Sequence, residues 1–230
     1  MQKNGYRLIS YKQYCITDLS IFAVILLVAE GTQFLALKLF PGQALYIVSF
    51  MLPIVMLVMI RWGWQSVFFA LASAVLYCAF NRGSLTNYIV YGAGNCFIML
   101  MLIPLKLIGS GKINSKAWGT VLLILGGWMC VYLGRSIVSA IAYAIYPTAE
   151  GSAWSGFVGF AASELLSLVM AIVIVLILRR FDGMVENQRD YLKRLGKLRE
   201  EEMRRREYGD EPIDIDQEAL DILNKDDGLY

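Results

Sequence analysis

Five polar side chains interrupt long apolar stretches of this sequence, and they are the residues best placed for chemistry. Two are carboxylic acids, two are amides and one is a guanidinium: Glu30, Gln33, Asn95, Arg135 and Glu164. An arginine can hold a carboxylate through two parallel hydrogen bonds, whereas a glutamate can accept an amine or a proton. We therefore predict that these five residues bind a small solute and that the chain is not an enzyme.

Six apolar stretches separated by short loops must position these side chains. A helix of roughly 17–25 apolar residues crosses the ~30 Å hydrocarbon layer, and helix is the open-chain structure that satisfies its own backbone there. With 57% hydrophobic residues, the chain is predicted to be an all-α polytopic membrane protein whose residues 1–178 form a six-transmembrane-helix bundle. The predicted spans are Asp18–Lys38, Ala44–Ile60, Gly63–Phe80, Asn87–Lys106, Ala117–Tyr146 and Trp154–Leu178. Pro53, inside the second span, should kink or shorten it.

The charged residues among the five should meet at one depth inside the bundle. At a rise of ~1.5 Å per residue, Asn95 and Glu164 lie ~12–15 Å below one surface, and Glu30 and Arg135 reach a similar level from the other. A charge at the membrane centre costs at least ~2.5–3.5 kcal/mol, so these groups should face inward. One alternative is a structural Glu–Arg ion pair. The second alternative is a site for a solute or an ion, and it is favoured because two glutamates stand against one arginine, which leaves one carboxylate without a partner.

The basic residues predict that both termini are cytoplasmic. Lys and Arg near the ends of spans are retained on the cytoplasmic side. One face carries most of them, namely Lys3, Arg7, Lys12, Arg61, Lys106, Lys112, Lys116, Arg179, Arg180, Arg189, Lys193 and Arg194. The loops of the opposite, outer face carry Lys38 and Arg82 alone.

Aromatic residues gather toward the predicted outer face and have two interpretations. They are Tyr46, Tyr77, Tyr88, Tyr91, Tyr143, Tyr146 and Trp154. They form either an interfacial aromatic belt or the lining of a pocket.

Small residues recur every four positions in the sixth span, at Gly159, Ser163, Ser167 and Ala171. Such a ridge lets another helix approach closely. That helix belongs either to this chain or to a partner membrane protein, and we predict the ridge as a partner interface.

Two further segments follow the spans. Residues 179–207 are predicted to continue the sixth helix as an amphipathic helix or short coiled coil, because apolar residues recur at three- and four-residue spacing. Its apolar face comprises Phe181, Met184, Tyr191, Leu195 and Leu198, of which Phe181, Met184 and Leu195 are predicted to contact a partner. Residues 208–230 are acidic and expected to be disordered, either as a solubilising end or as a docking peptide for a cytosolic protein.

Several site classes are excluded by residue type. The sequence contains no histidine, which removes the usual zinc ligand and the base of a serine hydrolase. The stretch from Gly109 to Ile113 resembles a phosphate loop but has lysine at 106 instead of the first glycine, and Ile113 instead of the magnesium-binding Ser or Thr. We predict no cofactor, no metal and no nucleic-acid partner, and any use of ATP must come from another chain.

Three short motifs resemble the substrate-specific S component of energy-coupling factor (ECF) importers. They are Met59–Gly63 (MIRWG), Tyr88–Asn95 (YIVYGAGN), and the RFDG of residues 180–183 followed by Glu186, Gln188 and Tyr191-Leu192. The resemblance implies a bacterial cytoplasmic membrane protein that binds a vitamin-like micronutrient. It also implies a membrane-embedded T component and two cytosolic ATPases as partners.

The sequence thus favours the substrate-binding subunit of a multi-subunit micronutrient importer. The alternative is a non-transporting MreD-like membrane scaffold that recruits cytosolic partners through its C-terminal tail. A third interpretation, a small proton-coupled carrier, is weakened because the two halves show no inverted repeat. A cavity in contact with Arg135 and a glutamate would favour the importer, and a solidly packed ion pair the scaffold.

Overall fold

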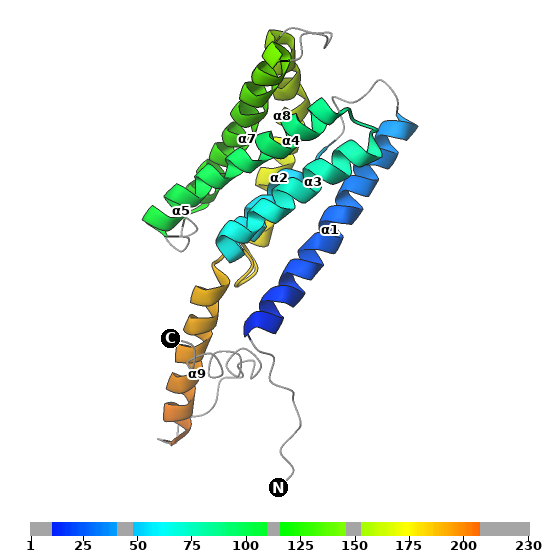
Figure 1. Cartoon of the computed structure of the whole chain (residues 1–230). Coiled ribbons are helices and arrows are strands. Elements are labelled where there is room, and N and C mark those ends of the chain that lie inside the picture. The colour runs from blue at the N-terminus through cyan, green and yellow to red at the C-terminus, as the bar shows by residue number, and fades with distance from the viewer. Residues whose placement is uncertain (1–10, 41–47, 110–115, 146–152, 208–230) are drawn as a thin grey trace.

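The computed structural model describes residues 11–40, 48–109, 116–145 and 153–207, and no strand occurs in them. Figure 1 shows a bundle of helices from which one helix, α9, projects at the end where α1 begins. The helices are α1 (Tyr11–Leu39), α2 (Met51–Trp62), α3 (Ser66–Phe80), α4 (Leu85–Cys96), α5 (Leu102–Ile108), α7 (Ala117–Ile145), α8 (Ala153–Leu178) and α9 (Gln188–Glu207), with short 3-10 turns η2 (Gly63–Gln65) and η3 (Phe97–Met101).

Four helical stretches of the described chain are long and apolar enough to cross a membrane: Tyr11–Leu39, Met51–Phe80, Leu85–Ile108 and Ala117–Ala142. The second stretch takes α2, η2 and α3 together, and the third takes α4, η3 and α5 together. The face of α1 turned away from the bundle is apolar and exposed, as lipid contact requires; it carries Ile16, Ile21, Val24, Leu27, Val28 and Leu35. The predicted all-α fold is confirmed for the described residues, and their long apolar helices suggest a membrane-embedded protein.

Helix α2 is the centre of the bundle, because every residue from Met51 to Trp62 is buried. It packs against α1, α3, α7 and α8. The chain turns at Gly63, whose φ of 69° favours glycine, and α3 returns beside α2. Met51 and Tyr77 consequently line the same cavity, although they would lie ~39 Å apart on one continuous helix.

The second predicted span begins later than expected. Residues 48–50 are not helical and α2 starts at Met51, whereas the sequence predicted Ala44; residues 41–47 lie outside the described part. Pro53 falls in the first turn of α2, where its missing N–H has no intrahelical acceptor to lose. The proline therefore marks the start of a shortened helix.

The close approach of α4 and α7 brings two of the predicted residues together. A Cβ atom added to Gly94 would lie 2.6 Å from Cγ and 2.7 Å from Cα of Arg135, and one added to Gly134 would lie 2.6 Å from the carbonyl oxygen of Gly94. Real side chains do not tolerate such distances, so the two glycines permit the contact. It places Asn95 beside Arg135.

The predicted continuation of the sixth helix into residues 179–207 is wrong. Residues 179–187 form turns, and α9 starts only at Gln188, so Phe181 and Met184 do not share a helical face with Leu195. The turn depends on Gly183, which has φ +71° and would carry a Cβ 2.6 Å from the Tyr191 ring. The backbone oxygen of Gly183 also accepts a hydrogen bond from Nε2 of Gln188 at 2.8 Å.

The ridge of small residues on α8 faces the inside of this chain wherever its side chains are described. Ser167 and Ala171 are buried within the bundle, and Oγ of Ser167 accepts a hydrogen bond from the backbone N–H of Ser49. Of the two alternatives for the ridge, the structure thus supports packing against helices of this chain. Neither residue is available to contact a partner protein. The surroundings of Gly159 and of the Ser163 side chain are outside what the structure describes, and so is the acidic segment 208–230.

Candidate functional site

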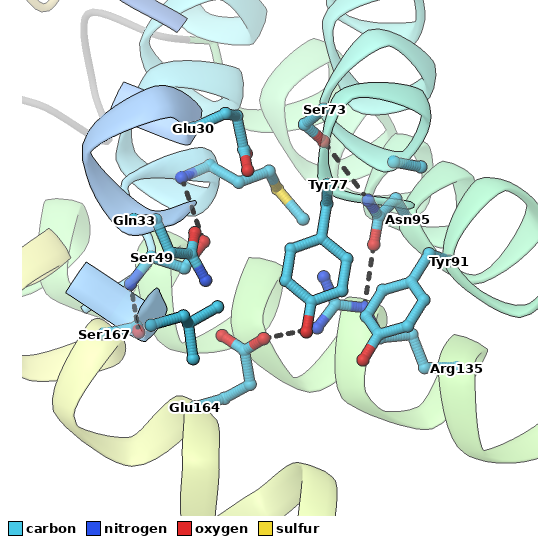
Figure 2. Close-up of a pocket in the computed structure, with 13 residues that line it drawn as sticks. Glu30, Gln33, Ser49, Ser73, Tyr77, Tyr91, Asn95, Arg135, Glu164 and Ser167 are labelled. Carbon is cyan, nitrogen blue, oxygen red and sulfur yellow. Dashed lines mark hydrogen bonds and ion pairs between the residues drawn. The ribbon is translucent and has the colours of Figure 1, made fainter. Parts of the chain in front are cut away.

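A polar cavity of about 100 Å³ lies between α1, α2, α3, α4, α7 and α8. All five side chains that the sequence selected line it, which confirms that they converge (Figure 2). Their predicted role in binding a solute stays a prediction. The lining consists of Glu30, Gln33, Leu37, Ser49, Met51, Ser73, Ala74, Tyr77, Tyr91, Asn95, Arg135, Glu164 and Ser167.

One wall of the polar cavity is a connected network centred on Arg135. This arginine is 5% exposed; its Nε donates to Oδ1 of Asn95 at 2.8 Å, and its Nη1 forms an ion pair with Glu164. The guanidinium carbon lies 4.8 Å from the centre of the Tyr91 ring, a distance suited to a cation–π contact. Nε, Nη1 and one face of this guanidinium are therefore engaged within the protein.

Asn95 extends this network into α3. Its Nδ2 donates to the backbone oxygen of Ala70 and to Oγ of Ser73, both at 3.3 Å. The Ser73 hydroxyl in turn donates to the same Ala70 oxygen at 3.0 Å. The amide thus fixes the orientation of Arg135, since both ends of the amide are held.

The opposite wall of the polar cavity, formed by α1, has a carboxylate that no described residue pairs with in place of a bonded network. Glu30 is 4% exposed, and among the described residues it has no hydrogen-bond or ion-pair partner. Gln33 lies one turn further along the same face of α1 and also lines the cavity. In Figure 2 both side chains point into the space that separates α1 from Tyr77 and Glu164. A buried carboxylate in this position is costly unless something compensates it.

Sequence reasoning missed Ser49 and Ser73 as cavity residues, and it assigned Ser167 to a partner interface instead of to the cavity. Ser49 and Ser167 join the start of α2 to α8 through a 2.9 Å hydrogen bond, and Ser73 holds Asn95. Serines in apolar helices often bond to their own backbone, as Ser73 also does, so nothing in the sequence distinguished them. For Tyr77 and Tyr91, the pocket interpretation is the one that the structure supports.

A second cavity of about 270 Å³, here the side cavity, adjoins the first. Tyr77 and Tyr91 line both, and their ring centres are 4.8 Å apart. The rest of its lining comes from the end of α3, the turn that follows, the first half of α4 and α7: Cys78, Asn81, Gly83, Thr86, Asn87, Val90, Ser139 and Ala142. The side cavity thus lies between the polar cavity and the end of the bundle opposite α9.

A separate polar cluster lies at the α9 end of the bundle; we name it the Arg61 cluster (Asp18, Arg61, Trp62, Gly183 and Gln188). Arg61 pairs with both carboxylate oxygens of Asp18, at 2.8 and 3.0 Å. Its Nη1 donates to the backbone oxygen of Gly183 at 2.9 Å, and Nε1 of Trp62 donates to Asp18. Neither cavity touches this cluster, which joins α1, α2 and the turn before α9.

The polar cavity has the chemistry of a binding site. Two carboxylates face one guanidinium, with hydroxyl and amide groups around them, and the described residues include no group of three metal-ligating side chains.

No protein-family description, curated protein or solved structure matches this chain.

Proposed function

We propose that this chain is the substrate-binding membrane subunit of a multi-subunit micronutrient importer, energised by separate ATPase subunits. The observation that carries the proposal is the polar cavity, whose three charged residues come from three helices far apart in the sequence. A membrane protein that needed only an ion pair to join two helices would pack around it without a space.

The proposed arrangement is a bundle of six spans, with α4, η3 and α5 forming one of them. The basic residues would place the α9 end in the cytosol. The polar cavity would then lie in the outer half, with the side cavity as the solute's approach from outside. Solute binding deep between helices is typical of membrane transporters.

Purification of the full chain from bacterial membranes, without overproduction of other proteins, tests this function. We expect a small solute to co-elute, together with one further polytopic membrane protein and ATPases of the importer type. Co-elution of cell-shape proteins, with no solute and no ATPase, would instead identify the MreD-like scaffold.

One variant strengthens the test. Arg135→Leu should release the solute while the protein partners remain, because the partners contact other surfaces. Loss of the partners with the solute still bound would contradict the proposal.

A further inference from the structure

The two walls of the polar cavity differ in how completely their polar groups are satisfied. On the α4–α7–α8 wall, Arg135 is bonded to Asn95 and paired with Glu164, and it stacks on Tyr91. On the α1 wall, Glu30 is almost fully buried and no described residue pairs with it. A solute entering the cavity meets an arginine that already has an anionic partner and a carboxylate that no described residue pairs with.

The net charge of the cavity lining also favours a positively charged solute. Glu30 and Glu164 bring two negative charges and Arg135 one positive charge, so the ionised lining residues leave one negative charge uncompensated. Placing a carboxylate of the solute here would add a third negative charge to a site with one cation. A cationic group on the solute would neutralise the excess and form charge-assisted hydrogen bonds.

The remaining lining fits a donor-rich head group. The Gln33 side chain, one turn from Glu30, offers an amide oxygen as a further acceptor, and the hydroxyl groups of Ser49 and Ser167 lie on the same cavity wall as the start of α2. The volume of about 100 Å³ is below the ~300–1,000 Å³ typical of pockets that enclose a drug-sized ligand. A compact group such as an ammonium fits this space.

We propose that Glu30, assisted by Gln33, binds the positively charged nitrogen of the solute, so that the substrate class is a small organic cation that carries a protonated amine. This inference rests on the proposed solute-binding function and deepens it. Arg135 then serves as a fixed counter-charge that holds Glu164 in place, and Glu30 is the residue that selects the charge of the solute.

Calorimetric titration of the full chain in detergent tests the inference with two probes of matched size, n-propylammonium chloride and sodium propionate. We expect the ammonium to bind and the carboxylate not to bind. Glu30→Gln, which keeps the shape of the side chain, should weaken ammonium binding by about 10- to 100-fold, because the ammonium then bonds to a neutral amide oxygen instead of a carboxylate. Asp182→Asn, in the exposed turn before α9, should bind as the parent chain does.

Three results would overturn the inference. Binding of propionate in place of propylammonium would identify an anion site at Arg135, and binding of neither would exclude an amine site. Equal ammonium binding by the parent chain and Glu30→Gln would mean that the Glu30 carboxylate does not bind the ammonium. Mass spectrometry of the co-eluting solute separates this inference from the function: an anionic solute that Arg135→Leu releases keeps the function and rejects the cation.

Discussion

The two halves of the bundle each hold a buried arginine paired with a carboxylate, and the two ion pairs have different surroundings. Arg61 and Arg135 are both 5% exposed. Around Arg61, one arginine faces one carboxylate and the remaining donors reach backbone oxygens, with neither cavity nearby. Around Arg135 there is a cavity and a second carboxylate, Glu30, that no described residue pairs with. A matched ion pair holds helices together, and an unmatched one beside a cavity is suited to binding.

Replacing the two arginines gives the largest expected effects and tests this comparison directly. Arg61→Leu and Arg135→Leu should each lower the free energy of unfolding by ~3–5 kcal/mol, because a buried carboxylate loses its partner. Arg135→Leu should in addition abolish solute binding, because Glu164, Asn95 and Tyr91 lose the side chain that holds this wall of the cavity in place. Arg61→Leu should retain solute binding in the folded fraction. Thermal unfolding and calorimetric titration of both variants in detergent provide the two measurements.

The Arg61 variant should also loosen α9. The arginine holds the backbone oxygens of Gly183 and Met184, so its loss should speed proteolysis within residues 179–187. Equal cleavage rates for the two variants would contradict the structural role given to the Arg61 cluster.

Glycine substitutions on α4 give the next largest effect. Gly94→Ala places a Cβ against the backbone of Arg135, so α4 must move away from α7 at a cost of ~1–3 kcal/mol, and solute affinity should fall several-fold. Gly92→Ala is the matched control, since nothing lies within 4 Å of its added Cβ. Alanine is favoured over glycine in a helix by up to ~1 kcal/mol, so this control should be neutral or stabilising.

Glu30→Leu should separate stability from function. Removal of a buried carboxylate that no described residue pairs with should raise the free energy of unfolding by about 1–3 kcal/mol, while solute binding is lost. Thermal unfolding without solute measures the first effect and calorimetric titration the second. A large loss of stability would mean that Glu30 is structural, as Asp18 is.

The smallest effect concerns pH and the turn before α9. Burial raises the pKa of Glu186 above its ordinary value, and Arg194 offsets this only in part. The folded chain therefore holds this proton more tightly than the unfolded chain, so the group lowers stability as the pH rises through its pKa. Glu186→Gln should be more stable than the parent at neutral pH by less than ~0.5 kcal/mol. The difference in thermal unfolding should vanish below about pH 4, where the carboxyl group is protonated in both the folded and the unfolded chain.

The sequence predicted the convergence of the five polar residues because lipid makes isolated charges costly wherever they lie. That argument depends on residue type and depth alone, so it needed no knowledge of helix faces. The same argument did not specify which carboxylate pairs with Arg135. Arg135 pairs with Glu164 and not with Glu30 because of the close contact between α4 and α7 and the packing of α8. The spacing of glycines in the sequence does not by itself determine either arrangement.

The start of α2 and the break before α9 were not predictable from hydropathy. An apolar window from Ala44 to Ile60 is continuous, and only the placement of Pro53 in a first turn shows where helix begins. In residues 179–187 the apolar spacing fits a helix, but Gly183 adopts a positive φ and packs on Tyr191. Local backbone conformation and a tertiary contact override the periodic pattern there.

Native mass spectrometry of the parent chain, Arg135→Leu and Arg61→Leu, released gently from detergent, tests most directly whether the polar cavity binds a solute. The account predicts one added small-molecule mass on the parent chain and on Arg61→Leu, and none on Arg135→Leu. Equal occupancy of all three chains, or the same loss of bound mass from both arginine variants, would contradict it.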